Sequence, residues 1–110
     1  MEQVDCCKLE IFLPKDYFDA LKRALGEVDA GHIGRYDRCL SYSSVMSCWR
    51  PLEGTNPYLG KEGEVSCEPE LKVEVTCRRE RLEETIRAIK AVHPYEEPVI
   101  NVIPLLRTGL

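Results

Sequence analysis

Apolar and polar side chains alternate along two segments of the chain, which is the period of a half-buried β-strand. Residues 6–13 and 71–77 each place an apolar side chain at every second position, with mostly charged or hydroxyl side chains between. Residues 99–105 follow Pro98, are rich in valine and isoleucine, and are too few for a helix of ordinary length. The pattern therefore predicts three strands, over 6–13, 71–77 and 99–105.

Two other segments repeat their apolar residues every three or four positions, which is the period of a helix with one buried stripe. The first stripe consists of Phe18, Leu21, Leu25 and Val28, and the second of Leu82, Ile86, Ile89 and Val92. Proline restricts its own backbone and disfavours the helical conformation in the residue before it, so Pro94 ends the second helix near His93. We predict helices over 16–28 and 81–92.

The middle of the chain lacks helical periodicity. Residues 36–50 are rich in hydroxyl and aromatic side chains, and we predict a long strand or hairpin arm there, with extended structure resuming over 64–68. Between them, residues 51–63 carry a proline or glycine at every third position: Pro51, Gly54, Pro57, Gly60 and Gly63. Such a segment cannot form a helix or a central strand. We interpret it as an ordered loop that crosses the protein surface or a neighbouring subunit.

The predicted order is β-α-β-β-α-β, in a chain whose 110 residues suit one domain, 1–110. Split βαβ units of this kind form an α+β, ferredoxin-like fold: a four-stranded antiparallel sheet with two helices on one face. Phe12 interrupts the polar face of the first strand, and the last strand is apolar almost throughout. We therefore expect another subunit to cover the second face of the sheet.

Charge and hydropathy limit the partners. The net charge is -4, and the 15 basic residues are interleaved with acidic ones, so we expect no nucleic-acid binding. We expect no membrane span, because no stretch approaches the roughly 18 consecutive apolar residues that one needs. The first residues lack the basic and apolar regions of a secretory signal, so we expect a cytoplasmic protein.

The six cysteines include no pair with the C-x-x-C spacing of zinc sites. In a cytoplasmic protein we interpret them as reduced thiols that act as small hydrophobic side chains. Cys39 and Cys48 remain the exception, because a hairpin would bring them near each other and allow an oxidised pair.

The segment His93-Pro94-Tyr95-Glu96-Glu97-Pro98 holds an imidazole, a phenol and two carboxylates in a rigid corner. One hypothesis is a metal or anion site of His93, Glu96 and Glu97, with His32 joining from a glycine-rich turn. The alternative is structural: His93 and Tyr95 cap the helix and bond backbone carbonyls, while a glutamate accepts backbone N–H groups. The aromatics Tyr36, Tyr42, Trp49 and Tyr58 allow a similar choice, between stacking on a ligand and anchoring an interface or a half-buried strand.

Three segments together, 31–39, 50–60 and 93–98, resemble the YqfO, or Nif-three-like, family. In that family this domain occurs inserted between the halves of dinuclear-metal proteins, and also alone, and we expect this chain to be of the second kind. The resemblance implies a ferredoxin-like fold related to the CutA and PII-like proteins, which assemble as oligomers, commonly trimers. It implies no metallohydrolase activity, since the metal centre lies in the flanking halves. The chain departs from the family at Val45-Met46-Ser47, where glycines are usual.

We therefore expect a non-enzymatic binding or regulatory module that forms a homo-oligomer, a trimer or a dimer, and binds a small molecule or metal at clefts between subunits. Its candidate ligand-binding residues are His32, Gly34, Tyr36, Arg50, Pro57, His93, Tyr95, Glu96 and Glu97. The candidate metal ligands are His93, Glu96 and Glu97, with the cofactor left open and a divalent metal as the candidate. The alternative is a purely structural module for assembly or partner docking. An enzyme with its site at a subunit junction is a third hypothesis, for which the sequence offers no substrate.

Overall fold

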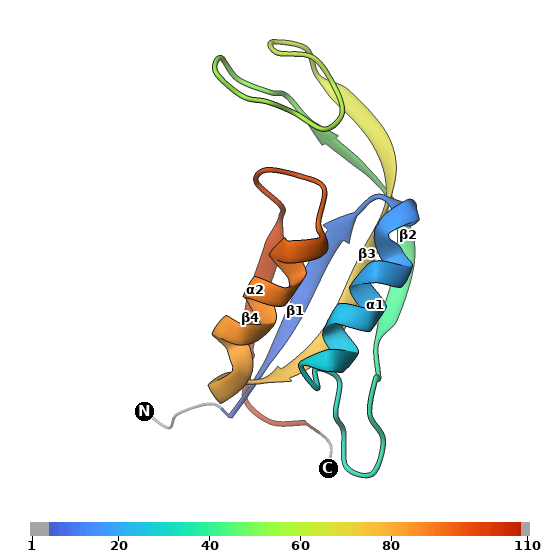
Figure 1. The fold of residues 1–110 in the computed structure, drawn as a ribbon, viewed down its shortest axis with the longest axis vertical. Helices are drawn as coiled ribbons and strands as arrows, with labels where there is room; N and C mark the ends of the chain where they lie inside the picture. Colours follow the sequence, from blue (N-terminus) through green and yellow to red (C-terminus); the bar gives the residue numbers. More distant parts are fainter. Residues whose placement is uncertain (1–4, 109–110) are drawn as a thin grey trace.

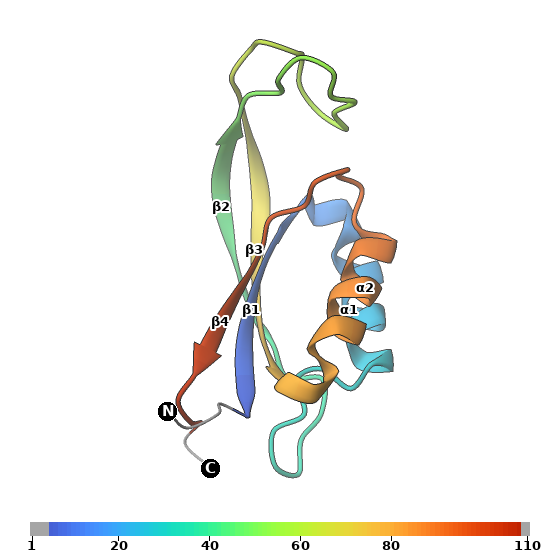
Figure 2. The same cartoon turned by 90° about the vertical axis from the view of Figure 1, so that its left-hand side faces the viewer.

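The structure is a computed structural model that describes residues 5–108. Its elements in chain order are β1 (Cys6–Leu13), α1 (Phe18–Glu27), β2 (Ser41–Trp49), β3 (Ser66–Arg78), α2 (Leu82–Val92) and β4 (Ile100–Leu105). The strands form one antiparallel sheet in the order β2-β3-β1-β4, and both helices cover the same face of it (Figure 2). This confirms the predicted βαββαβ, ferredoxin-like α+β fold.

The core lies between the central strands and the helices. In β1, Leu9 and Ile11 are completely buried, and the register pairs them with Val75 and Val73 of β3. The helices supply the other side, with Leu21 and Leu25 from α1 and Ile89 from α2 among the buried residues. These are positions that the alternation and the helical stripes predicted. Truncating a fully buried leucine here, as in Leu9→Ala, is expected to cost about 2–5 kcal/mol.

Element boundaries differ modestly from the predictions. Each helix begins after a single 3₁₀ turn, Lys15–Tyr17 before α1 and Arg79–Arg81 before α2, and no side chain caps either helix. The two predicted extended segments around residue 70 are one strand, β3, which is 13 residues long. β3 is one continuous strand because β2 pairs with it without interruption from Ser66 to Glu74.

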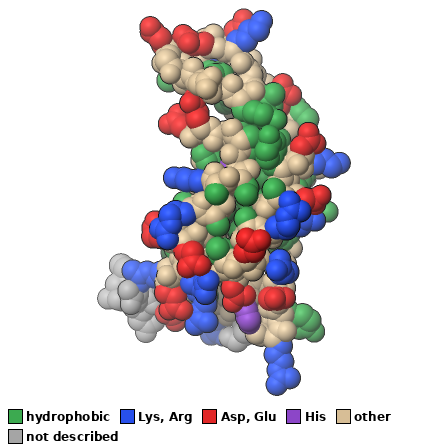
Figure 3. Space-filling model, viewed as in Figure 1, with side chains coloured by type: hydrophobic (Ala, Val, Ile, Leu, Met, Phe, Trp, Pro, Cys, Tyr) green, Lys and Arg blue, Asp and Glu red, His purple; other side chains and the backbone are tan. Residues whose placement is uncertain are grey.

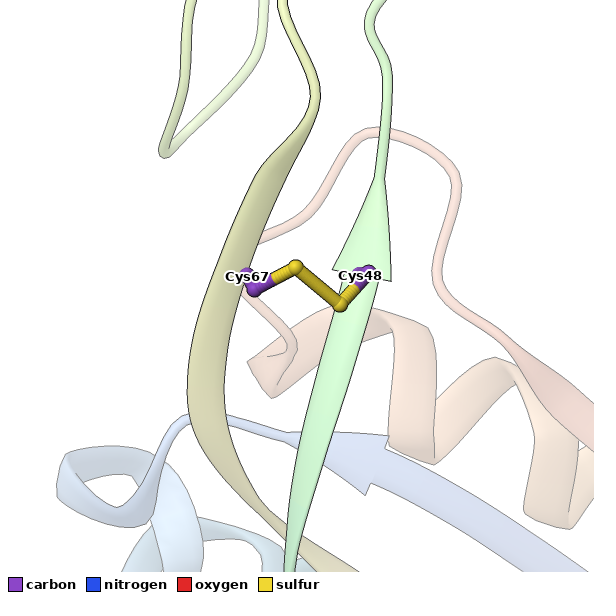
Figure 4. Close-up of a disulfide and its surroundings, with 2 residues drawn as sticks. All are labelled: Cys48 and Cys67. Atoms are coloured by element: carbon purple, nitrogen blue, oxygen red, sulfur yellow. A yellow bond between two sulfur atoms is a disulfide. The ribbon is translucent and has the colours of Figure 1, made fainter.

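The β2–β3 hairpin extends well past the helices, and its loop bends back over the helix side of the sheet (Figures 1 and 2). Near its end a disulfide joins Cys48 of β2 to Cys67 of β3, with Cα atoms 4.1 Å apart (Figure 4). Both cysteines are solvent-exposed and face each other in the strand register. The disulfide therefore closes the base of the Pro/Gly-rich loop predicted over 51–63.

Two expectations about the cysteines were wrong. Reduced thiols were expected for Cys48 and Cys67, and the alternative pairing of Cys48 was with Cys39. Cys39 lies before β2 begins, at the opposite end of that strand, so the antiparallel register gives Cys48 a different neighbour. Cys6, Cys7, Cys39 and Cys77 are free, and Cys77 is buried in the core as its alternation pattern predicted.

The second face of the sheet is not the apolar surface that Phe12 suggested. Along β1 and β3 it carries an ion-pair ladder in which Lys8 contacts Glu74 and Lys72 contacts Glu10. A hydrogen bond from Asn101 and the pairing with Lys72 lower the pKa of Glu10. On this face β4 adds the exposed apolar side chain of Ile103, which the register places opposite Lys8, whereas Val102 lies opposite Leu9 on the helix side. In residues 5–108 no helix is long and apolar enough to cross a membrane.

Candidate functional site

A cleft of about 510 Å³ lies beside the β2–β3 loop, and the segment that follows α2 forms its other wall. It is lined by residues of β2, the loop, β3, Phe12 of β1 and the corner after α2. Figure 3 shows hydrophobic side chains gathered below the loop on the helix side of the molecule. Five of the predicted ligand-binding residues line the cleft: Arg50, Pro57, Tyr95, Glu96 and Glu97. The fold thus joins two of the three segments that the resemblance singled out.

Aromatic rings form one wall of the cleft. The ring of Tyr95 lies 5.9 Å from that of Trp49 and 5.9 Å from that of Tyr58, measured between centroids. Trp49 is held in place because its indole N–H donates a hydrogen bond to the backbone carbonyl of Leu59, at 3.2 Å. Tyr58 also meets Tyr17, edge to face at 5.9 Å, which ties the loop to the start of α1. Such tilted contacts are favourable for aromatic pairs and fix the shape of the wall.

A buried carboxylate, Glu70 of β3, lies against this wall. Its residue is only 5% exposed, and the Tyr95 hydroxyl donates a 2.6 Å hydrogen bond to Glu70 Oε2. Burial, together with this carboxylate, raises the pKa of the Tyr95 phenol far above its ordinary value of 10.0. Tyr95 is therefore a neutral hydrogen-bond donor at physiological pH. The structural hypothesis expected the Tyr95 hydroxyl to bond a backbone carbonyl, which was wrong, because its partner is the Glu70 carboxylate.

Glu70 was missed by sequence reasoning. It lies one residue before the predicted strand 71–77 and shares the face of Lys72 and Glu74, which are only partly buried. The residue is buried because the corner after α2 folds over this part of β3 and Tyr95 covers it. No signal in the strand itself distinguishes Glu70 from its partly buried neighbours.

Glu96 connects the corner to the hairpin loop. Its Oε1 accepts a 2.8 Å hydrogen bond from the backbone N–H of Asn56, forty residues away in sequence. This contact agrees with the hypothesis that a corner glutamate accepts a backbone N–H. Glu97 and Arg50 are exposed at the cleft, so their head groups are open to solvent or a ligand.

His93 is part of the framework beneath the cleft. It is 8% exposed, and its Nε2 lies 2.6 Å from the backbone oxygen of Phe12. The backbone N–H of Tyr95 can only donate, so Nδ1, 3.2 Å away, is the acceptor and Nε2 carries the proton. Burial lowers the pKa of His93, which keeps the imidazole neutral. The structural hypothesis for His93 thus describes its contacts correctly.

The predicted metal ligands do not fit a metal ion as they lie. Both ring nitrogens of His93 are engaged by backbone groups, and one oxygen of Glu96 is engaged by Asn56. Within residues 5–108, no three His, Cys, Asp or Glu side chains are grouped to hold a metal. A metal bound by His93, Glu96 and Glu97 would first have to break contacts that hold the corner in place.

The other three predicted site residues lie at the far end of the sheet. His32, Gly34 and Tyr36 belong to the turn between α1 and β2, where Gly31 N–H bonds to the carbonyl of Thr76 at 2.8 Å. Figure 1 shows this turn at the opposite end of the strands from the hairpin loop. His32 of a single chain therefore does not lie near His93, Glu96 and Glu97, and the expectation that they form one site was wrong for a single chain.

His32 itself is engaged locally. Its Nδ1 lies 3.1 Å from both carboxylate oxygens of Asp29, and its Nε2 lies 3.2 Å from the carbonyl of Gly34. The hydrogen bond and charge of Asp29 raise the pKa of His32. Tyr36 is 76% exposed, and its backbone pairs with Ile33 across a tight turn. The turn is therefore held in place by its own hydrogen bonds, and both ring nitrogens of His32 have partners within it.

The fold and the cleft define the class: a ferredoxin-like α+β protein with an aromatic and acidic cleft beside its β2–β3 hairpin. The chain belongs to the CutA1 divalent ion tolerance protein family, whose sequence profile matches residues 37–109.

Longer proteins share the same region, in agreement with the resemblance to the YqfO, or Nif-three-like, family. A GTP cyclohydrolase 1 type 2 homolog of Halalkalibacterium halodurans is 38% identical over 102 residues, which are 93% of this chain and 27% of that protein. A Bacillus cereus protein related to NIF3 superimposes with a TM-score of 0.82 at 28% identity, over 96% of this chain and 27% of that one. The chain thus spans about a quarter of the length of these relatives.

A shorter protein matches over most of both lengths. The periplasmic divalent cation tolerance protein CutA from Archaeoglobus fulgidus superimposes with a TM-score of 0.70 and 22% identity. The match covers 94% of this chain and 86% of that one. At this identity the likeness concerns the fold alone.

Proposed function

We propose that this chain is a small-molecule-binding regulatory module whose ligand occupies the cleft between the β2–β3 loop and the corner after α2, and that it performs no catalysis. The observation that carries the proposal is the cleft itself. Its volume of about 510 Å³ is within the range of small-molecule sites, roughly 300–1,000 Å³.

The chemistry of the lining supports a binding role. Trp49, Tyr58 and Tyr95 supply apolar area, while Arg50 and Glu97 supply polar groups at the mouth. A few polar groups in a mostly aromatic wall are typical of ligand pockets. The described lining includes no cysteine or histidine placed beside a free base, which nucleophilic catalysis would need. Binding is therefore the simplest use of this cleft.

The family description mentions divalent ions, and a divalent metal was the candidate cofactor. The hydrogen bonds of His93 and Glu96 described above argue against a metal held at the corner of a single chain. We therefore propose an organic ligand in the cleft rather than a metal cofactor.

We also propose that the module works as a homo-oligomer, a trimer or a dimer. β4 is an edge strand of the described sheet, and Val102 and Ile103 on it are more than one-third exposed. An unpaired edge with apolar side chains is a template for pairing with another chain. The same observation supports the second candidate function, a purely structural module for assembly or partner docking, in which the cleft has no ligand.

Native mass spectrometry of protein purified without added metal or chelator tests these proposals together, because one spectrum reports subunit number and retained mass. A matched pair of variants locates the ligand. Val99→Tyr narrows the cleft from a position that is 54% exposed and lines it, whereas Val65→Tyr makes the same change at a 69% exposed position outside it. Ligand-observed NMR with a fragment library, applied to the same three proteins, covers the case of a ligand lost in purification.

The binding proposal expects an oligomer that retains mass, or binds fragments, in the wild type and in Val65→Tyr but not in Val99→Tyr. An oligomer without retained mass or fragment binding would overturn it in favour of the structural module. Retained mass that EDTA removes would restore the metal hypothesis. A monomer at micromolar concentration would contradict the assembly proposal.

A further inference from the structure

The charges that line the cleft are strongly unequal. Three glutamates line it, namely Glu70, Glu96 and Glu97, whereas Arg50 is the only lysine or arginine among the described lining residues. Arg50 is exposed, whereas Glu70 is only 5% exposed. Glu70 therefore places one negative charge deep in the cleft, whereas Glu96, Glu97 and Arg50 are exposed.

Glu70 retains acceptor capacity for a ligand. A carboxylate has about four lone-pair sites on its two oxygens, and the Tyr95 hydroxyl donates to Oε2 at 2.6 Å. Burying a carboxylate is costly unless it is paired or well hydrogen-bonded. Among the described residues, the ion pairs of the sheet involve Glu10 and Glu74 but not Glu70. A cation that enters the cleft would give Glu70 the opposite charge that it lacks.

The aromatic wall suits the same kind of ligand. The rings of Trp49 and Tyr58 each lie 5.9 Å from that of Tyr95, whose hydroxyl donates to the Glu70 carboxylate. The faces of such rings attract ammonium and guanidinium groups. An anion would meet the guanidinium of Arg50 at the exposed mouth, and the Trp49 indole N–H is already bonded to Leu59.

We propose that the cleft recognises an organic cation, with its ammonium or guanidinium head toward Glu70 and its apolar body against Trp49 and Tyr58. The proposal rests on the proposed function, since it names the chemical class of the ligand for that cleft. The two proposals can fail separately. A neutral or anionic ligand in the same cleft would agree with the proposed function and contradict the proposal of an organic cation.

Three probes of nearly equal shape separate charge from size: choline, its neutral analogue 3,3-dimethylbutan-1-ol, and the anion 3,3-dimethylbutanoate. Trp49 is the only tryptophan of the chain and lies in the cleft wall, so its fluorescence reports occupancy directly. Backbone ¹H–¹⁵N shifts of residues 47–58 and 95–99 provide a second readout. We expect choline to bind at least tenfold more tightly than the alcohol, and the anion more weakly still.

One variant and its control test the role of the buried carboxylate, and a third variant tests the aromatic wall. Glu70→Gln removes the charge but keeps the size and an acceptor for Tyr95, and it should reduce choline affinity about tenfold without changing that of the alcohol. Glu83→Gln makes the same change of charge on the exposed surface of α2 and should have no effect. Tyr58→Leu removes an aromatic face at a 47% exposed position and should weaken choline more than the alcohol.

Preferential binding of choline that Glu70→Gln abolishes would support the proposal. Equal binding of choline and the alcohol, tighter binding of the anion, or no response to any probe up to 50 mM would each overturn it. In the first two of these cases the cleft still binds small molecules, so the proposed function stands. If Glu70→Gln is unfolded at the temperature of the assay, the effect of Tyr58→Leu on choline binding decides whether the proposal stands.

Discussion

The two ends of the sheet carry similar sequence motifs but differ in what they enclose. At the cleft end, the segments 50–60 and 93–98 meet through Asn56 and Glu96 and through Tyr58 and Tyr95, and they leave about 510 Å³ between aromatic and acidic side chains. At the turn end, the chain between α1 and β2 packs on itself. There the carbonyl of Gly31 accepts the N–H of Cys39 at 2.9 Å, and a Cβ at Gly31 would lie 2.3 Å from the carbonyl of Cys39.

The difference separates two uses of histidine and glycine. At the turn end, His32 bonds to Asp29 and Gly34 within a few residues, while Gly31 bonds to Cys39 and to Thr76 of β3, so the motif holds the turn against the sheet. At the cleft end, His93 and Glu96 bond to residues far away in sequence, and this leaves Glu70, Glu97 and Arg50 around an open space. The second arrangement leaves about 510 Å³ beside these side chains, whereas the hollow that Ala30, Arg38 and Leu40 share with α1 is smaller, about 390 Å³. Four experiments test this contrast, beginning with the largest expected effect.

The first experiment removes the covalent link at the cleft end. The Cys48→Ser/Cys67→Ser variant should lose about 3 kcal/mol of unfolding free energy, because the disulfide closes a loop with a sequence separation of 19 and restricts the unfolded chain. Urea unfolding with and without a dithiol reductant measures the loss. Hydrogen exchange should rise in residues 50–65 but not in 30–40.

The free thiol Cys39 provides the control, since Cys39→Ser should change the unfolding free energy by less than about 0.5 kcal/mol. If reductant leaves the wild type as stable as before, the cleft end does not depend on the disulfide.

The second experiment strains the turn end. Gly31 has φ of 82° and no space for a Cβ, so Gly31→Ala should cost about 2 kcal/mol or more in unfolding free energy. Gly54 is a matched control with φ of 88° and nothing within 4 Å of a Cβ, so Gly54→Ala isolates the backbone cost of about 1 kcal/mol. Thermal unfolding of both variants measures the difference. Similar losses would show that the turn is less tightly packed than the contacts indicate.

The third experiment addresses the hydrogen bond in the cleft wall. Tyr95→Phe keeps the ring but removes the 2.6 Å bond to the buried Glu70 carboxylate, so it should cost about 2 kcal/mol. Tyr42→Phe, at a 59% exposed position, should change stability by less than about 0.5 kcal/mol. Combining Tyr95→Phe with Glu70→Gln should cost less than the sum of the two single changes. Additive losses would mean that the two groups do not interact.

The fourth experiment uses pH, because the two histidines of the chain shift in opposite directions. Burial lowers the pKa of His93 below 6.5, so the unfolded chain takes up a proton first. Stability should therefore fall as pH drops below about 6.5, by at most about 1.4 kcal/mol per pH unit. His93→Gln, which keeps a donor toward Phe12, should flatten this dependence.

His32 should act in the reverse sense and more weakly, since it is exposed. Asp29 raises its pKa, so its stabilising contact is complete below pH 6.5 and is lost as pH rises through the raised value. NMR titration of the two imidazoles measures both pKa values directly. A His93 pKa above that of His32 would contradict the assignment of the buried and exposed ends.

Much of the fold could be predicted because its signals are local. The alternation from Leu9 to Leu13 and the helical stripe through Leu21 and Leu25 depend only on which side chains share a face, and those faces became the core. Pro94 likewise ends α2 through sterics within two residues, and the helix ends at Val92. The order of these elements then leaves few arrangements, which is why the ferredoxin-like topology was predicted correctly.

The site depended on contacts that no local pattern specifies. The register of β2 on β3 pairs Cys48 with Cys67 rather than leaving it near Cys39. The fold of the corner over β3 buries Glu70, a position for which the sequence pattern predicted no role. The sequence by itself thus determined the elements and their buried faces, because helix and strand periods act over a few residues. Only the tertiary structure decided which polar groups meet in the cleft, because that depends on strand register and loop packing between residues far apart in the chain.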